Sequence, residues 1–370
     1  MNLSSFLYNY LQQHQEIPFV EFMQLALYHP KAGYYSAGLP KFGKEGDFIT
    51  APELTPLFGQ TLANQCQQLI SLLTNPIIFE FGAGSGRLCV DLLTRLEHLN
   101  CLPDTYYILE VSGSLQARQK QLINEEISHL AHLVTWINQW PTEPFNGIVI
   151  ANEVLDAMPV HRFIQTAKAL LESYITLNQQ NELTEIFKPT NDLRLRNYLN
   201  HALPELPLPY QSEANLFIES WLSQVSSILK QGAIILIDYG YPRHEYYHPD
   251  RNQGTLMCHY RHQAHTNFLV HVGEQDITAH VDFTQVAEAA SAANLQVAGY
   301  TNQAAFLLAN GLLSLVEEID NERNRIIATQ AVKKLTLPSE MGELFKVMGL
   351  TKNLDLFLTG FQLQDKRASL

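Results

Sequence analysis

The sequence predicts a doubly wound α/β fold, in which helices cover both faces of a parallel sheet. From Pro76 onward, short and largely apolar runs alternate with segments of helical spacing, as expected for strands buried on both faces. One of these runs, Ile77–Phe81, leads directly into Gly82-Ala83-Gly84-Ser85-Gly86. Because glycine has no Cβ, a ligand can approach such a strand-to-helix loop closely. The two observations together predict an open α/β sheet with a ligand site after its first strand.

The first 75 residues are expected to form helices and a long loop. Apolar side chains at helical spacing predict two short helices over 4–28, interrupted near Pro18. The segment from His29 to Pro52 is rich in glycine and proline, and its length predicts a functional lid. A helix over 53–73 is predicted to follow.

The alternating core supplies the remaining elements of the predicted fold. Strands are expected over 77–81, 106–110, 133–137, 147–151 and 233–238, and helices over 88–99, 115–126, 215–229 and 283–293. Two runs around Asn178-Gln179-Gln180-Asn181 predict a hairpin, and the residues between 238 and about 273 read as a long polar loop. The predicted division is N-terminal helices and lid loop (1–75), core (76–163 and 210–300), an insertion (164–209) between strands four and five, and a C-terminal helical addition (301–370).

Composition and charge exclude several classes of protein. Of 370 residues 46% are hydrophobic and 16% are charged, which is an ordinary globular composition. With 24 Lys and Arg against 37 Asp and Glu, the net charge of −13 provides no broad basic face, so neither nucleic acid nor a membrane is an expected partner. No apolar run approaches the roughly 20 residues of a membrane span. The four cysteines form no CxxC pair, which disfavours a disulfide framework or a zinc ribbon.

The glycine loop and two acids point to a nucleoside ligand. Its spacing is GxGxG, because Arg87 stands where the dinucleotide fingerprint has its third glycine. Glu80, two residues before the loop, resembles the first motif of S-adenosylmethionine-dependent methyltransferases. Glu110 ends the second predicted strand 24 residues after Gly86, where an acid that accepts both ribose hydroxyls is expected. Three alternatives stay open. The glycines serve only the backbone, Glu110 is a solvated strand end, or the chain is a nicotinamide oxidoreductase. The residues expected to hold S-adenosylmethionine are Glu80, Gly82, Gly84, Gly86 and Glu110.

Polar residues also follow the fourth predicted strand, at Asn152, Glu153 and Asp156. Ligands of open α/β sheets bind outside the carboxyl ends of the strands, so these side chains would meet the reacting atoms. Two carboxylates suit a guanidinium, which is always charged. One of them could also accept the proton that a nitrogen releases when it is methylated. Alternatively, Asn152 and Asp156 cap a following helix and leave only Glu153 near the substrate.

The same run, Ala151-Asn152-Glu153-Val154-Leu155-Asp156-Ala157-Met158-Pro159-Val160, resembles the signature of a family of protein arginine methyltransferases. This family includes the mitochondrial complex I assembly methyltransferase and its bacterial relatives. The resemblance extends from Glu21-Phe22-Met23 to Glu340-Met341-Gly342-Glu343-Leu344-Phe345-Lys346, nearly the whole chain. Further matching blocks are Gly33-Tyr34-Tyr35, Gly46-Asp47-Phe48-Ile49-Thr50-Ala51-Pro52-Glu53, Asp238-Tyr239-Gly240-Tyr241, Gly254-Thr255-Leu256 and Asp276-Ile277-Thr278-Ala279-His280-Val281-Asp282-Phe283.

The resemblance implies a class I, Rossmann-like methyltransferase fold and a protein partner that presents an arginine. In the eukaryotic member it implies symmetric dimethylation of an arginine on a complex I subunit. The first basic residue here is Lys31, which does not fit a presequence. A bacterial cytoplasmic protein is therefore expected, with the mitochondrial matrix as the location only if a presequence has been removed.

Several further residues are candidates for the site. Glu153 is the first choice to orient a guanidinium, followed by Asp156, Asp238 and His280. Asp238 could equally be a turn former, and His280 a buried structural histidine. Asn152 and Thr50 complete the set of residues expected to hold the cofactor. Thr50-x-x-Glu53 also fits a helix capping box, and Asp282 could cap the helix that follows it.

Two other interpretations were weighed. His259, His262, His265 and His271 cluster in one loop but lack neighbouring cysteines or a matching acid set, so no metal site is expected. An assembly or scaffold protein that binds the cofactor without transferring a methyl group is the alternative from another functional class.

Overall fold

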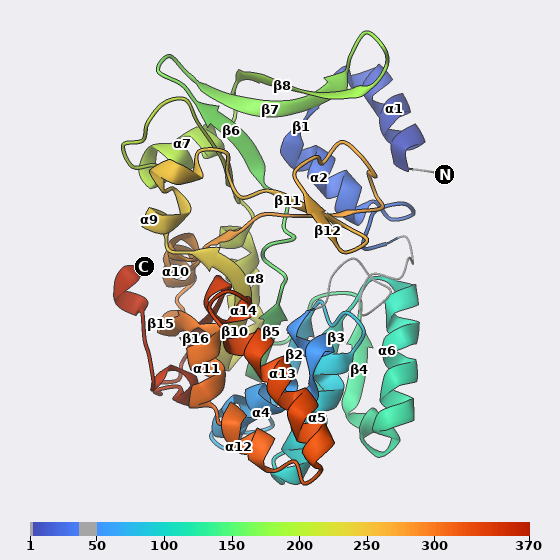
Figure 1. Cartoon of the computed structure of the whole chain (residues 1–370), viewed down its shortest axis with the longest axis vertical. Helices are drawn as coiled ribbons and strands as arrows, with labels where there is room; N and C mark the ends of the chain where they lie inside the picture. The colour runs from blue at the N-terminus through green and yellow to red at the C-terminus, as the bar shows by residue number, and fades with distance from the viewer. Residues whose placement is uncertain (1–2, 37–49) are drawn as a thin grey trace.

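The computed structural model describes residues 3–36 and 50–370, and its largest sheet confirms the doubly wound arrangement (Figure 1). The strand order is β15-β16-β10-β5-β2-β3-β4, and β14 also pairs with β10. The strands from β10 to β4 are parallel, whereas β16 runs antiparallel to both neighbours. The chain winds outward in opposite directions from the β2–β5 junction, where ligands bind in such sheets. The bounds are β2 (Ile77–Phe81), β3 (Thr105–Leu109), β4 (Val134–Ile137), β5 (Phe145–Asn152), β10 (Leu229–Tyr241), β14 (Val281–Asp282), β15 (Gln296–Asn302) and β16 (Phe345–Lys352).

Helices cover both faces of this sheet, which explains why its strands read as unbroken apolar runs. Ile148 and Ile235 are fully buried in a core shared with α4, α5, α6 and α11 to α13. Their neighbours Val149 and Ile234 are fully buried on the other face, against α8 and α10. The helices are α4 (Pro56–Ile70), α5 (Arg87–His98), α6 (Gly113–Glu126), α8 (Ile218–Ile228), α10 (Phe283–Ala292), α11 (Gln303–Ala309), α12 (Leu312–Glu317) and α13 (Glu322–Thr336).

The helix predicted over 53–73 is divided in two, α3 (Ala51–Leu54) and α4. Thr55 adopts an extended backbone with φ −167° and caps α4 by accepting a hydrogen bond from the backbone N–H of Leu57. Pro56 occupies the first position of α4, where its missing N–H costs nothing. The two N-terminal helices are confirmed as α1 (Leu3–His14) and α2 (Phe19–Tyr28).

A second sheet, with α1, α2 and α7 (Leu193–Ala202), forms an upper lobe above the main sheet (Figure 1). The predicted hairpin is present as β7 (Leu170–Leu177) and β8 (Leu183–Pro189). The strands β6 (His161–Gln165) and β9 (Tyr210–Ala214), at the two ends of the predicted insertion, pair with each other. The N-terminal strand β1 (Glu16–Pro18) joins the same sheet beside β7. The upper lobe is therefore built from segments far apart in the chain.

Two further expectations are corrected. The polar loop before Gly273 contains α9 (Arg243–Tyr246) and the strands β11 (Met257–Tyr260) and β12 (Gln263–His265), which pair with β13 (Asp276–Thr278) beyond it. The tail after residue 300 is not only helical: besides α11 to α13 and α14 (Met341–Leu344), it supplies β16, which pairs with both β10 and β15 and is buried along most of its length. The division of the chain into domains stays a prediction.

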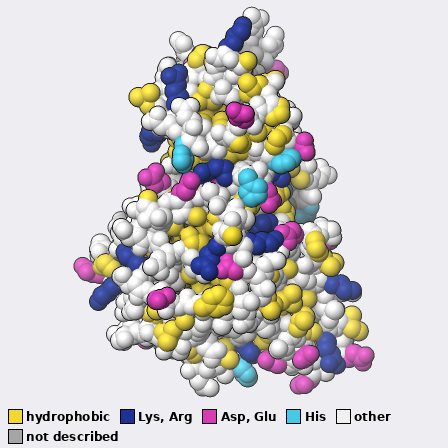
Figure 2. Space-filling view, turned by 90° about the vertical axis from the view of Figure 1, so that its left-hand side faces the viewer, with side chains coloured by type: hydrophobic (Ala, Val, Ile, Leu, Met, Phe, Trp, Pro, Cys, Tyr) yellow, Lys and Arg dark blue, Asp and Glu magenta, His cyan; other side chains and the backbone are white. Residues whose placement is uncertain are grey.

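The surface carries charges of both signs. On the face seen in Figure 2, acidic, basic and histidine side chains are interspersed among exposed apolar ones. Over residues 3–36 and 50–370, none of the helices has both the length and the apolar character that a membrane span requires. Part of the predicted lid loop, including Gly46 and Asp47, lies outside the described residues.

Candidate active site

A cavity of about 330 Å³ lies where the carboxyl ends of β2, β3 and β5 face the upper lobe. The open end of a parallel sheet is the usual place for a ligand. Residues from the glycine loop, from the ends of three strands and from the segments around Tyr35 and Thr50 line it. The structure brings eight of the predicted residues together in this lining: Thr50, Glu80, Gly82, Gly84, Glu110, Asn152, Glu153 and Asp156.

The glycine loop adopts a backbone that favours glycine. Gly82 and Gly84 have φ of 62° and 54°, in the left-handed region, and both line the cavity. A Cβ on Gly82 would lie 3.3 Å from Cγ2 of Val154. Gly86, in contrast, is not part of the described cavity lining, because it begins α5 and faces Gln119. The contact of Gly86 with the cofactor therefore stays a prediction, while Gly82 and Gly84 lie at the cavity.

The end of β3 presents a buried carboxylate. Glu110 is 8% exposed, and its Oε1 accepts a hydrogen bond from the backbone N–H of Ser112 at 2.8 Å. Its Oε2 accepts from Nε2 of Gln119 at 3.2 Å. Two donors thus fix the orientation of this acid at the cavity wall.

Glu80, in β2 just before the glycine loop, is more deeply buried. The hydroxyl of Tyr106 donates a hydrogen bond to its Oε2 at 2.7 Å. Burial raises the pKa of Glu80 to about 7, although the bond from Tyr106 acts in the opposite direction. A side chain that is 2% exposed and still reaches the cavity lining is placed to meet a ligand in the loop.

Thr50 and Glu53 do not form the expected capping box. Thr50 begins α3 without a side-chain hydrogen bond, and the carboxylate of Glu53 accepts one from the hydroxyl of Ser85 in the glycine loop. Glu53 is held away from Thr50 in this way. Both Thr50 and Glu53 line the cavity, so the segment before α4 closes one side of it.

The loop after β5 carries two acids into the cavity. Glu153 has φ of 53°, and its backbone N–H donates to the carbonyl of Ile237 at 2.9 Å. Nδ2 of Asn152 donates to Oε1 of Glu153 at 3.2 Å. Burial, and next the negative charge of Asp156, raise the pKa of Glu153 to about 8. Because no helix follows β5 before β6, the helix-cap alternative for Asn152 and Asp156 is wrong.

Asp156 is held from two sides. Its Oδ2 accepts a hydrogen bond from the hydroxyl of Tyr239, and its backbone N–H donates to Asp238 at 3.2 Å. Its Oδ1 is buried and has no hydrogen-bond partner among the described residues, and the same holds for Oδ1 of Asn152. Burial raises the pKa of Asp156 to about 6, against the effect of the Tyr239 bond. A buried anionic oxygen without a donor is costly unless a ligand supplies one.

Asp238 and His280 are not among the described residues that line the cavity. Oδ2 of Asp238 accepts hydrogen bonds from the backbone N–H groups of Leu155 and Asp156, because β10 continues to Tyr241 and leaves Asp238 inside the sheet. Burial and neighbouring carboxylates raise its pKa well above the usual value. A direct contact between this side chain and the substrate stays a prediction.

His280 lies behind the cavity wall. Its ring packs edge-on against Tyr239, with centroids 5.0 Å apart, and stacks on Tyr241 at 5.4 Å. Burial, followed by the positive charges of Arg251 and Lys346, lowers its pKa to about 4. These contacts are consistent with the packing interpretation of His280, whose role in the reaction stays a prediction, and Asp282 caps α10.

Sequence reasoning missed residues that the upper lobe contributes. Tyr28 and Tyr35 line the cavity, and their rings stack with centroids 5.5 Å apart. The hydroxyl of Tyr35 donates to both oxygens of Asp276 at 3.0 Å, and burial of Asp276 is complete. Tyr35 and Asp276 are 241 residues apart, so no local spacing could show that they meet.

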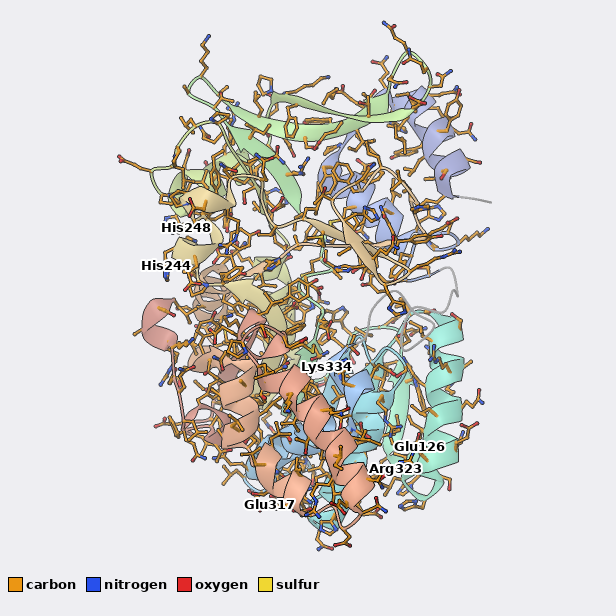
Figure 3. The ribbon with its side chains drawn as sticks, viewed as in Figure 1. Glu126, His244, His248, Glu317, Arg323 and Lys334 are labelled. Carbon is orange, nitrogen blue, oxygen red and sulfur yellow. The ribbon has the colours of Figure 1, made fainter. Side chains whose placement is uncertain are left out.

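The basic residue of the glycine motif has a structural role. Arg87 pairs with Asp91 at 2.8 Å and with Glu126, labelled on α6 in Figure 3, at 2.6 Å. These bonds tie the start of α5 to the end of α6. Among the residues that the structure describes, no group of three or more His, Cys, Asp or Glu is arranged to hold a metal ion.

The residues at this site fit an adenosyl cofactor with a charged sulfur centre. Glycine backbone without Cβ atoms, a fixed carboxylate after β3 and a further acidic group after β5 surround one cavity. Oδ1 of Asp156, in the loop after β5, is buried without a hydrogen-bond partner among the described residues. Fold and site together define a class I, cofactor-dependent methyltransferase.

Comparison with known proteins identifies the family. The model of the family described as "Putative S-adenosyl-L-methionine-dependent methyltransferase" matches residues 61–301, and the chain belongs to this family. A solved protein from Burkholderia thailandensis bound to S-adenosyl-homocysteine is similar over 100% of this chain and 96% of its own, with 39% identity and a TM-score of 0.95. The cofactor is therefore S-adenosylmethionine, and the nicotinamide alternative is wrong.

Curated relatives of lower similarity have a more specific name. The mouse "Protein arginine methyltransferase NDUFAF7, mitochondrial" is 25% identical over 90% of this chain and 80% of its own length. Its Drosophila melanogaster homologue is 26% identical, over 90% of this chain and 81% of its own length.

Proposed function

We propose that this methyltransferase acts on an arginine side chain of a protein substrate, at an omega nitrogen. The observation that carries the proposal is the acidic end of the cavity, where Glu153 and Asp156 line the wall and Oδ1 of Asp156 is buried without a partner among the described residues. A guanidinium brings both positive charge and N–H donors to such an oxygen. The name of the curated relatives supports the same substrate class.

We assign the cofactor to the other part of the cavity. Glu110 would accept hydrogen bonds from the ribose hydroxyls, while Gly82, Gly84 and Glu80 would border the methionine portion, with Gly86 serving only the turn into α5. Thr50 and Asn152 would close its sides. When bound, S-adenosylmethionine supplies a methyl group on a positively charged sulfur.

The chain's own task is to align the guanidinium and to take its proton. Glu153 and Asp156 hold the planar group, which fixes the nitrogen that reacts. A bond forms between that nitrogen and the methyl carbon, the carbon–sulfur bond breaks, and the nitrogen loses one proton. The carboxylate of Glu153 is the proton acceptor: the positive charge of a bound guanidinium favours its ionised form, against the burial that raises its pKa to about 8 in the ligand-free protein. Asp238 acts through the backbone of Asp156 and is a positioning residue.

The test is transfer of labelled methyl groups into protein. The chain is incubated with methyl-labelled S-adenosylmethionine and an extract of its host, and the labelled protein is digested and analysed by mass spectrometry. The expected result is label on an arginine, with the mass giving the number of methyl groups. Label on lysine, or on small molecules only, would contradict the proposal. Binding of S-adenosyl-homocysteine with no labelled product would favour the scaffold alternative.

A further inference from the structure

A glutamine on α6 connects the two parts of the cofactor site. Gln119 is fully buried, although α6 is otherwise largely exposed, with Ile123 as its other buried residue. Its Nε2 donates hydrogen bonds to the carbonyl oxygen of Gly84 at 2.9 Å and to Oε2 of Glu110 at 3.2 Å. Its Oε1 accepts a hydrogen bond from the indole Nε1 of Trp136 at 2.9 Å.

The arrangement satisfies every polar atom of the amide. Nε2 has two hydrogens and uses both, one toward the glycine loop and one toward the acid at the end of β3. Trp136 fixes which end of the amide is oxygen, because an indole N–H can only donate. The amide therefore cannot rotate by half a turn without losing its bonds.

The same contact accounts for Gly86. A Cβ at position 86, which has φ of 90°, would lie 3.3 Å from the Cα and Cβ of Gln119. Glycine at this position leaves room for α6 to approach the loop, so that the amide of Gln119 can reach the carbonyl of Gly84.

We infer that Gln119 is a positioning residue for the cofactor: it sets the separation and orientation of the glycine loop relative to the carboxylate of Glu110. Gln119 does not line the cavity that the structure describes, so it acts through these two groups and not on the ligand. A loop and an acid held at a fixed separation bind a rigid nucleoside with less loss of conformational freedom. The inference rests on the assignment of both groups to the cofactor made above.

The test measures binding of S-adenosyl-homocysteine to the full-length chain by calorimetry. Gln119→Met removes all three hydrogen bonds at similar side-chain volume. Gln119→Glu keeps an oxygen that can accept from Trp136 but replaces the donating Nε2 by a second oxygen. We expect each variant to bind S-adenosyl-homocysteine at least about tenfold more weakly than the unaltered protein. Gln121→Met, an exposed position on the same helix, is the matched control and should remain within about twofold.

A spectroscopic readout separates positioning from simple packing. In protein labelled with ¹⁵N-tryptophan, the indole signal of Trp136 should stay near its normal position in Gln119→Glu and move in Gln119→Met. Weak binding in Gln119→Glu with an unmoved signal supports the inference. If Gln119→Glu binds S-adenosyl-homocysteine within about twofold of the unaltered protein, the inference is overturned. The two hydrogen bonds that Nε2 donates would then not be needed for binding. Should Gln119→Met not fold, Gln119→Glu carries this criterion alone.

The cofactor assignment itself is tested separately by Glu110→Ala. Normal binding of S-adenosyl-homocysteine to that variant would contradict the assignment of Glu110, whereas normal binding to Gln119→Glu would overturn only the role of Gln119.

Discussion

The hydroxyl of Tyr239 donates a hydrogen bond to Oδ2 of Asp156, whose Oδ1 is buried without a partner among the described residues. One oxygen of this carboxylate is thus fixed by the protein, and the other is left for a ligand. The backbone of the same residue is held by Asp238. An acid restrained at these two points can present its oxygen to a substrate in a single orientation.

Removal of the Tyr239 hydroxyl should shift the pH dependence of transfer. The bond from Tyr239 lowers the pKa of Asp156, so in Tyr239→Phe this pKa rises above about 6 and the carboxylate is protonated at higher pH. The acid limb of the pH–rate profile should therefore move upward by about one unit, with kcat/KM about fivefold lower near pH 6. Tyr241→Phe, which keeps its ring against His280, serves as the control. An acid limb at the same pH in Tyr239→Phe would show that Asp156 does not control transfer.

A side chain at Gly84 should prevent cofactor binding. Gly84 has φ of 54° and lines the cavity, so Gly84→Val strains the backbone by about 1–2 kcal/mol and fills ligand space. We expect affinity for S-adenosyl-homocysteine to fall by more than about hundredfold, while circular dichroism shows a folded protein. Gly113→Ala, where an added Cβ has no heavy atom within 4 Å, should bind normally. Tight binding by Gly84→Val would place the ligand elsewhere.

Loss of the Glu153 carboxylate should separate binding from transfer. Glu153→Ala leaves the glycine loop and Glu110 untouched, so affinity for S-adenosyl-homocysteine should stay within about threefold. Transfer to protein should fall by about hundredfold, because the guanidinium loses one of its two anionic partners and its proton acceptor. Calorimetry and a methyl-transfer assay measure the two effects. Unchanged turnover in Glu153→Ala would remove Glu153 from the mechanism.

The buried acids should also make stability depend on pH. Because burial raises the pKa of Glu153 from an ordinary 4.5 to about 8, the folded protein binds more protons than the unfolded chain between these values. Its contribution to stability is greatest below pH 4.5 and is lost as the pH rises through about 8. Glu153→Gln should therefore raise Tm of the ligand-free protein at pH 8.5 by about 2–4 °C, with a smaller effect at pH 6.

The exposed Glu125 provides the comparison for that experiment. Glu125→Gln should leave Tm unchanged at both pH values. If Glu153→Gln lowers Tm at pH 8.5, the carboxylate is stabilised by a partner, and the account of its pKa is wrong.

The sequence located the parts of the site that depend on strand ends. Glu110 and Glu153 were predictable because parallel strands bring their carboxyl ends to one edge of a sheet, and each acid follows such a strand. Asp238 also ends an apparent apolar run, but the structure places it outside the described cavity lining. The apolar run appeared to stop there, but β10 continues to Tyr241, so the side chain turns toward the backbone of the neighbouring loop.

Contacts between distant segments could not be predicted from spacing. Tyr35 reaches Asp276 only after the upper lobe assembles from the N-terminal segment and the chain beyond β10. Gln119 lies on a helix whose pattern shows no reason for a buried amide. The tail was expected to be helical because helical segments dominate it, yet β16 lies between β10 and β15 in the main sheet.

The most direct test of the account is a crystal structure of this protein with S-adenosyl-homocysteine bound. We predict ribose hydroxyls hydrogen-bonded to Glu110, the amino-acid portion along Gly82 and Gly84, and the sulfur facing Glu153 and Asp156. A cofactor bound outside this cavity, or one whose sulfur points away from both acids, would contradict it.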